Sequence, residues 1–360
     1  MQSIDLSAAR SPAADLAPGP GDVAPPSTGA QRLSWLFRHS LRAGQVHPLL
    51  HVLRQRADVH GALLETRAAA RPAVQVPKPA HIDIEELRRK LRELPSLPQV
   101  VLDVMTLLRD EEVSAAAVAD RIERDQALAA QTLRIANSAF YGVPGRIGTI
   151  RNAINVIGLR TVSSLLTTAA VATRFSTTTC PEFEFGTYWR HAIATAIAAR
   201  GLAVQLRMDE NLAFTAGLLH DIGRLALAVQ FPAEMGRALR YARDADVPAL
   251  DAEREILGAD HIGAGVLLAT YWHFPASVVS AIEHHHMPTR TASAKPTLTD
   301  VVHVADAIAH GLDPSQGANE TVPSTEVSAW DRLTLSVPQY LAVLDTTAAG
   351  VAGLCEALAL

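Results

Sequence analysis

From residue 81 to the C-terminus, the hydrophobic positions recur at helical spacing almost without interruption. Val100, Val104, Leu107 and Leu108 form one such stripe, and residues 150–171 carry two more. Apolar residues three or four positions apart lie on one face of an α-helix. We find no run of alternating β-branched residues bounded by turns, so no sheet is required. The pattern therefore predicts an all-α fold.

Turn residues divide this helical chain into segments. The run Leu94-Pro95-Ser96-Leu97-Pro98 ends one predicted helix, and Pro98 stands where the next could start. Residues 137–145 include Gly142, Pro144 and Gly145 and are typical of a helix exit followed by a loop. A last helix is predicted to begin at 336–338 and to pack back on the domain through Tyr340 and Leu344.

The first 80 residues differ from the rest of the chain. Residues 1–30, with Pro-Gly-Pro-Gly at 18–21, lack periodicity and are predicted to be a disordered tail. Residues 31–80 form a predicted basic amphipathic helical arm and linker, with leucines at helical spacing and arginines on the other faces. The arm either docks on a membrane surface or acidic partner, or contributes one or two helices that pack on the main domain.

A joint rich in Pro and Val, at 71–79, separates this arm from the later helices. We therefore expect residues 82–360 to fold alone. Within them, 82–312 should form the main domain, and 313–360 a C-terminal loop and helix that pack on it.

Composition narrows the class of protein. Hydrophobic residues make up 48% of the 360 and charged residues 19%, which is typical of a globular protein. A net charge of −5 without a basic stripe in the main domain argues against nucleic-acid binding. Cys180 and Cys355 are too few and too far apart for a disulfide framework or a cysteine metal site.

The chain shows no secretory signal and no predicted transmembrane segment. Its N-terminus lacks an apolar stretch and carries Asp5, Arg10 and Asp15. The longest run without Asp, Glu, Lys or Arg, between Asp260 and Glu283, is interrupted by histidines and a proline. We expect a cytoplasmic protein, whose oligomeric state the sequence does not indicate.

Candidate chemistry gathers in the second half of the chain. His220 and Asp221 are adjacent at the end of an apolar helix, and each can supply one metal ligand. Nine of the fourteen histidines fall between positions 191 and 310. Imidazole and carboxylate together suit Fe, Mn or Zn. A lone His-Asp pair is more often a hydrogen-bonded pair at a helix end, and His191 within an apolar helix is either a ligand or a core histidine.

Asp306 stands among apolar residues of another predicted helix. A carboxylate buried there is costly without a partner, which indicates a ligand or ion-pair role. His303 and His310, at i−3 and i+4, are alternative hydrogen-bond partners for it. We interpret His284 as a flanking surface residue and His273 as an ordinary helix-end histidine.

Three blocks of residues together resemble an HDOD domain, a relative of the HD and HD-GYP metal-dependent phosphohydrolases. The blocks are 94–98 with 122–125 and 137–142; Ala153-Ile154 with Ile157-Gly158-Leu159; and Trp189-Arg190-His191, 217–223 and 285–288. The resemblance covers about 94–312 and implies a compact multi-helix HD-superfamily-like bundle, preceded by a helical N-terminal half of the same domain. Gln126 departs from the family's usual Pro, and the arm before position 80 has no counterpart.

The resemblance also implies a metal site. HD-type hydrolases bind a divalent cation through a His, a His-Asp pair and a distant Asp, which here match His191, His220, Asp221 and Asp306. The HD-GYP branch adds a second ion through further histidines, which here match His261, His285 and His286. We therefore expect all seven side chains in one pocket.

The same resemblance implies a regulatory module of bacterial signalling that acts through contacts with signalling proteins, and it assigns no catalytic residue. Arg224 replaces the Lys of the HD-GYP enzymes and is a poor proton donor near neutral pH, and no Gly-Tyr-Pro loop follows His286. Phe140 and Tyr141 are either contact anchors or a cap over the core. The alternative function is a metal-dependent phosphodiesterase or phosphohydrolase acting on a nucleotide or cyclic dinucleotide.

Overall fold

The structure is a computed structural model in which the described residues are helices joined by loops. These residues are 36–37, 40, 47–58, 78–107, 113–143, 145–175, 180–288, 294–312 and 321–358. No strand occurs among them, so the all-α prediction is confirmed. The predicted disordered tail at 1–30 lies outside the described residues, as does most of the joint at 71–79.

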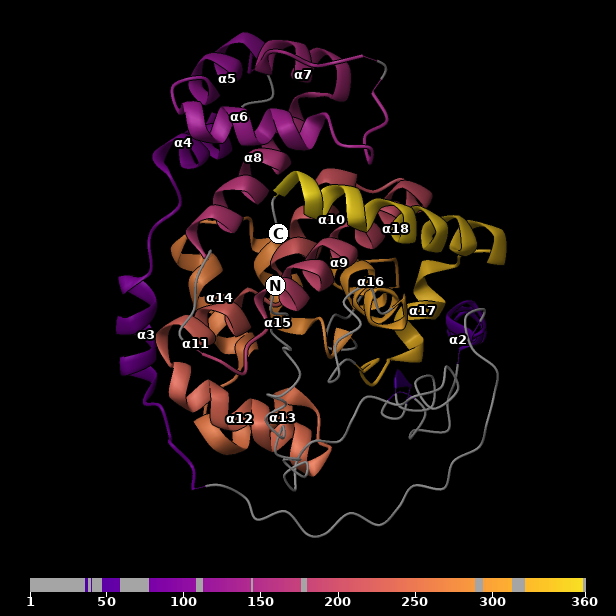
Figure 1. The fold of residues 1–360 in the computed structure, drawn as a ribbon. Helices are drawn as coiled ribbons and strands as arrows, with labels where there is room; N and C mark the ends of the chain where they lie inside the picture. The colour runs from indigo at the N-terminus through magenta and orange to yellow at the C-terminus, as the bar shows by residue number, and fades with distance from the viewer. Residues whose placement is uncertain are drawn as a thin grey trace, which may run out of the picture.

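The first half of the domain is a layer of short helices that leads into one longer helix. In Figure 1 this layer lies at the top, and α8 runs from it toward the centre of the molecule. The helices of the first half are α3 (Ile84–Glu93), α4 (Gln99–Leu107), α5 (Ala115–Ile122), α6 (Gln126–Ala136), α7 (Ile150–Ile157) and α8 (Leu159–Arg174). Helix α3 lies apart from this layer and contacts α14 (His261–Tyr271).

Side-chain caps begin several of these helices. Ser114, Asp125 and Thr149 each accept a hydrogen bond from a backbone N–H of the first turn. Gln126 is the first residue of α6, where the backbone N–H has no partner within the helix, so either Pro or Gln suits the position. Gly158 joins α7 to α8 with φ of 89°, which favours glycine.

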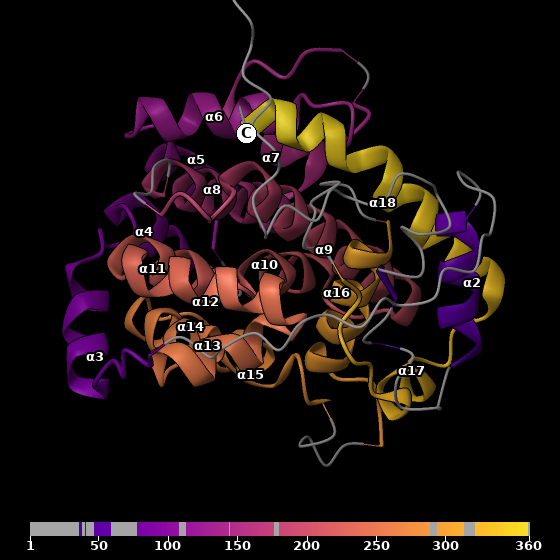
Figure 2. The same ribbon diagram turned by 60° about the horizontal axis from the view of Figure 1, so that its bottom comes forward.

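The second half of the domain is built around α9 (Phe185–Leu206), which packs against α10 (Glu210–Leu219), α16 (Leu298–Leu312) and α18 (Val337–Leu358) (Figure 2). A Cβ at Gly217 would lie 2.8 Å from the Thr195 carbonyl oxygen, so glycine lets α10 approach α9 closely. The other helices of this half are α10 (Glu210–Leu219), α11 (Ile222–Gln230), α12 (Pro232–Ala245), α13 (Ala249–Leu257), α14, α15 (Ala276–His284) and α16 (Leu298–Leu312).

The C-terminal part packs on this bundle through α17 (Val327–Leu333) and α18 (Val337–Leu358). Helix α18 begins where the sequence predicted, and Tyr340 and Leu344 are fully buried. Arg332 of α17 donates two hydrogen bonds to the buried carboxylate of Asp300 in α16, at 2.5 and 3.1 Å. This bidentate pair attaches the segment to the domain.

The described part of the N-terminal arm also packs on the domain. Helix α2 (Pro48–Asp58) contacts α16 and α18, and Leu53 is fully buried against Gly311. The backbone N–H of Val322 donates to the Leu36 carbonyl at 2.7 Å, which pairs the arm with the C-terminal part. Of the two alternatives for the arm, this packing favours helices on the main domain. Independent folding of 82–360 stays a prediction.

The aromatic pair at the end of α6 is half-buried against the core. Phe140 lies beside Gly350 of α18, where an added Cβ would come within 2.5 Å of its ring. The Arg200 guanidinium lies 5.8 Å from the Phe140 ring centre and 5.4 Å from that of Tyr141. These contacts favour the cap over the core and not an exposed contact anchor.

Two helical segments are long and apolar enough to cross a membrane by length and composition alone. They are Glu210–Gln230 and Val337–Leu358, whose most apolar windows are 78% and 50% buried inside the fold. Core helices of globular proteins meet the same test, and the first segment has His220 and Asp221 at its centre.

Candidate metal centre

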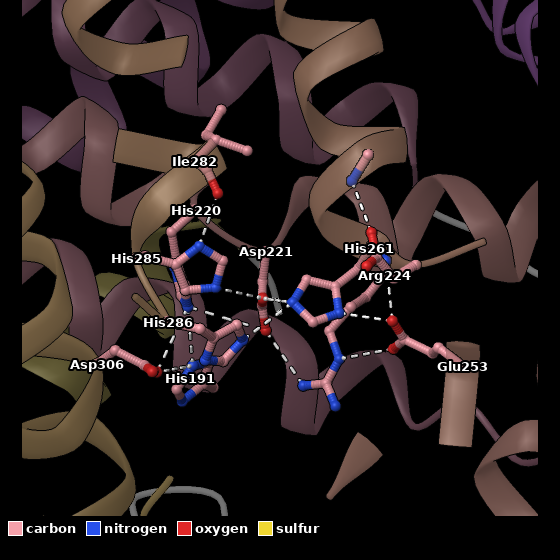
Figure 3. Close-up of polar contacts among 12 residues, drawn as sticks. His191, His220, Asp221, Arg224, Glu253, His261, Ile282, His285, His286 and Asp306 are labelled. Atoms are coloured by element: carbon pink, nitrogen blue, oxygen red, sulfur yellow. Dashed lines mark hydrogen bonds and ion pairs between the residues drawn. The ribbon is translucent and has the colours of Figure 1, made fainter. Parts of the chain in front are cut away.

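The structure brings all seven predicted ligands into one cluster at the centre of the second half (Figure 3). His191 comes from α9, the His220-Asp221 pair from the junction of α10 and α11, and Asp306 from α16. His261 begins α14, while His285 and His286 directly follow α15. Metal binding by these residues stays a prediction, but their convergence is what that prediction requires.

The first ligand group has three members: Asp306 and two histidines, His191 and His220. Oδ1 of Asp306 lies 3.1 Å from His191 Nε2 and 3.5 Å from His220 Nε2. The two histidine Nε2 atoms are 3.2 Å apart. His220 and Asp306 are therefore close enough to share an ion, as the expectation of one pocket requires.

The second ligand group has four members: Asp221 and the three histidines around it, His261, His285 and His286. Oδ1 of Asp221 lies 3.4 Å from His261 Nε2 and 3.6 Å from His285 Nε2. His286 Nε2 is 3.1 Å from His261 Nε2. The other carboxylate oxygen, Oδ2, lies 3.8 Å from His220 Nε2 of the first group. Asp221 therefore faces both groups and joins them.

Hydrogen bonds away from the centre orient three of the imidazoles. His220 Nδ1 lies 2.7 Å from the Gly217 carbonyl oxygen, and His285 Nδ1 lies 2.8 Å from that of Ile282. A carbonyl only accepts, so Nδ1 carries the proton in both rings. His261 Nδ1 is held at 2.6 Å by the Glu253 carboxylate. In each neutral ring the Nε2 lone pair is thus directed into the centre, as in histidines that ligate metals.

The donor atoms fit divalent ions. Ligands about 2.1 Å from one ion lie roughly 3.0–3.4 Å apart at tetrahedral or octahedral angles. The Nε2 pairs His191–His220 and His261–His286, at 3.2 and 3.1 Å, have this separation. His285 Nε2 and Asp306 Oδ1 are buried without an aligned hydrogen bond. A cation between these atoms would satisfy them.

Burial and charged neighbours shift the pKa values of the side chains in the cluster. Burial raises the pKa of Asp221, but His220 and Arg224 outweigh it and hold that pKa well below the ordinary value. Burial lowers the pKa of His220, yet Asp221 and Asp306 leave it raised. Burial and the neighbouring histidine His285 lower the pKa of His286. The Asp221 carboxylate is therefore ionised, the form in which it can coordinate a cation.

Glycine contacts set the spacing of the helices that carry these residues. A Cβ on Gly223 of α11 would overlap the His261 carbonyl and lie 2.6 Å from the Gly265 nitrogen of α14. The absence of a side chain lets α11 and α14 touch, which places His261 beside Asp221. The contact between α11 and α14 therefore depends on Gly223, which follows Asp221 by two positions.

Sequence reasoning missed Glu253 as part of the centre. Its side chain is 1% exposed and bonds to His261, while Arg224 Nε lies 3.6 Å from its other oxygen. A signal was present: Glu253 shares the core-facing side of α13 with Ile256 and Leu257. A carboxylate in such a place needs a partner.

Other polar residues took roles that the sequence left open. Of the two candidate partners for Asp306, His310 lies 3.3 Å from its Oδ1, whereas His303 Nδ1 donates to the His285 carbonyl at 2.6 Å. Asp260 caps α14 and stays outside the cluster. His284 and His273 also lie outside the two ligand groups.

The HDOD domain family matches residues 94–288, more than half of the chain. The chain belongs to the HDOD domain family. It is 25% identical over 266 residues to an uncharacterized protein of Treponema pallidum, covering 70% of this chain and 50% of that one. It is 29% identical over 149 residues to ribonuclease Y of Thermus thermophilus, covering 41% and 21% respectively. This HDOD chain thus spans half or less of the length of these curated relatives.

Solved structures share the fold. An HDOD domain protein of unknown function from Geobacter sulfurreducens matches with a TM-score of 0.62 at 22% identity, covering 76% of this chain and 99% of its own. A phosphohydrolase candidate from Shewanella amazonensis matches with a TM-score of 0.54 at 26% identity, covering 72% and 97%. The HDOD fold thus includes the first helical layer as well as the helices around the centre.

Proposed function

We propose that this protein is a regulatory module of bacterial signalling whose HDOD domain binds divalent metal and acts through contacts with partner proteins. The observation that carries the metal-binding part is the convergence of seven donor side chains on two adjacent positions. Three of their rings have Nδ1 engaged outside the centre, so little rearrangement is needed to coordinate an ion. Fe, Mn and Zn suit this mixture of imidazole and carboxylate.

The surroundings of Arg224 support a regulatory role over hydrolysis. Arg224 Nη1 donates to Asp221 Oδ2 at 3.1 Å, and Nε lies 3.6 Å from Glu253 Oε1. A guanidinium keeps its protons near neutral pH, so it supplies charge but no general acid. The ligands His220 and His285 are fully buried, which leaves a substrate little access to the coordinated face. A cytoplasmic location is part of the proposal and is tested by fractionation.

Metal analysis of gently purified protein tests the metal-binding part. We expect copurifying Fe, Mn or Zn that a chelator removes, and substantially less metal in Asp221→Asn. The loaded protein should not hydrolyse bis-p-nitrophenyl phosphate, cyclic dinucleotides or RNA. Absence of metal from the native protein, and failure to bind added Mn²⁺ or Zn²⁺, would contradict the proposal.

Partner contacts are tested separately, by crosslinking in cells that express wild type or variants. We expect the same partners with His220→Ala and Asp221→Ala, provided that circular dichroism shows unchanged helicity. If no protein crosslinks specifically to the wild type, the partner-binding part is wrong.

The second candidate function is a metal-dependent phosphodiesterase. The complete ligand set favours it, and so do the similarities to ribonuclease Y at 29% identity and to a phosphohydrolase candidate at 26%. Metal-dependent hydrolysis of any of the three substrates, abolished by Asp221→Ala in a protein of unchanged helicity, would establish this candidate in place of the regulatory one.

A further inference from the structure

A sixth histidine, His310, lies against the group around Asp306. It follows Asp306 by four positions on α16, so both side chains project from the same face of the helix. Its Nε2 lies 3.3 Å from Asp306 Oδ1, and its ring centre lies 4.2 Å from that of His191. Three imidazole Nε2 atoms therefore approach a single carboxylate oxygen.

That oxygen has no aligned hydrogen bond despite these three neighbours. Asp306 Oδ1 is buried, and the Nε2 atoms of His191, His310 and His220 lie 3.1, 3.3 and 3.5 Å from it without hydrogen-bond geometry. The separations from His191 and His310 fall within the roughly 3.0–3.4 Å that lies between two ligands of one ion.

We infer that His310 is the fourth protein ligand of the ion held by His191, His220 and Asp306. The inference rests on the proposed metal binding and deepens it. With His310, this group offers three imidazoles and one carboxylate, and the group of Asp221, His261, His285 and His286 offers the same set. The two halves of the centre then have equal donor sets.

Four protein donors change what such a site can do. A tetrahedral ion with four protein ligands has no open position for water or substrate, which is the pattern of structural sites, whereas catalytic zinc sites keep one position open. Two such sites side by side favour stabilisation and signalling over turnover.

The position of His310 is fixed by packing as well as by Asp306. The next residue, Gly311, receives Leu53 of α2, and an added Cβ there would lie 2.5 Å from a Leu53 methyl carbon. The His310 side chain is 13% exposed, while that of Asp306 is 3% exposed. His310 thus closes the group on its most exposed side, and truncating it opens the least buried coordination position.

The experiment compares metal binding by wild type, His310→Ala and the exposed α2 control His51→Ala. Affinity for Zn²⁺ is measured by competition with a chromophoric chelator. We expect His310→Ala to weaken Zn²⁺ binding at one of the two sites by more than about 10-fold. Replacing a residue that only hydrogen-bonds to a metal ligand already lowers metal affinity by about 10–100-fold. The second site and His51→Ala should keep wild-type affinity.

Cobalt absorption separates a ligand from a residue that only positions Asp306. Four-coordinate Co²⁺ absorbs visible light far more strongly than six-coordinate Co²⁺. We expect His310→Ala to lose about half of the visible absorption of the Co²⁺-loaded wild type, because one of two sites gains water ligands. If His310→Ala does not fold, His310→Asn with unchanged helicity serves instead.

The outcomes are distinct. An unchanged cobalt spectrum in the folded, Co²⁺-loaded variant would overturn the inference whatever its Zn²⁺ affinity, and would leave His310 as a partner of Asp306 only. A wild-type protein that binds neither Zn²⁺ nor Co²⁺ would overturn the proposed metal binding itself.

Discussion

The Glu253 carboxylate accepts two hydrogen bonds from one residue, His261. The His261 backbone N–H lies 2.8 Å from Glu253 Oε2, and ring Nδ1 lies 2.6 Å from the same oxygen. The contact joins the middle of α13 to the start of α14 and directs Nε2 of His261 toward Asp221. One carboxylate therefore fixes both the backbone and the ring of a predicted ligand.

Replacing Glu253 tests this relationship. We expect Glu253→Gln to lower Zn²⁺ affinity by about 10–100-fold, because a carboxylate behind a ligating histidine orients it and raises its basicity. The matched control is Glu255→Gln, since Glu255 is exposed on the same helix. Chelator competition measures both, and equal affinities would show that Glu253 does not support the site.

Removing metal should reverse the pH dependence of stability above pH 6.5. Burial lowers the pKa of His261, but Glu253 and Asp221 outweigh it, and the pKa values of His261 and His220 are both raised above 6.5. In metal-free protein these two groups stabilise the fold fully below pH 6.5, and the stabilisation is lost as pH rises through the raised values. Metal competes with the same protons, so metal affinity should increase over that range.

Thermal unfolding from about pH 6.5 to about pH 9 checks this expectation. The chelator-treated protein should become less stable with rising pH, while the Zn²⁺-loaded protein should hold or gain stability. Parallel curves for the two forms would contradict the assignment. His51→Ala is a control that should leave both curves unchanged.

Adding a methyl group at Gly223 should separate α11 from α14. Its Cβ would overlap the His261 carbonyl, so we expect Gly223→Ala to lower the free energy of unfolding by about 3 kcal/mol or more. Denaturant unfolding measures the loss. The control is Gly186→Ala, where the nearest atom to the new Cβ is a side-chain nitrogen at 3.9 Å. That change in a helix should be neutral or stabilise by roughly 0.5–1 kcal/mol.

The N-terminal arm should contribute measurable stability. Leu53 is fully buried between α2 and α16, so Leu53→Ala should cost about 2–5 kcal/mol of unfolding free energy. Gln55→Ala, an exposed change on the same helix, should cost far less. Limited proteolysis adds an independent measurement: a stable fragment starting before residue 48 would show that the arm is integral, and one starting near 82 would support independent folding of 82–360.

Much of this architecture could be predicted from the sequence because a helix requires apolar residues at fixed spacings only a few positions apart. Helix α4 (Gln99–Leu107) and the start of α18 near Ser336 follow from apolar spacing and turn residues a few positions apart. The HDOD resemblance likewise rests on short blocks of adjacent residues. Five of the seven predicted ligands stand in these blocks: His191, His220, Asp221, His285 and His286. The resemblance placed His261 and Asp306 by matching the family's further ligand positions.

The tertiary structure alone decided which side chains meet. Glu253 and His261 are eight positions apart on different helices, and only the close contact of α11 with α14 at Gly223 brings their pair against Asp221. His303 and His310 were equal candidates for Asp306 by spacing, since i−3 and i+4 both lie on its face. The packing of α15 and α17 drew His303 to the His285 carbonyl and the Glu326 N–H, and left His310 beside Asp306.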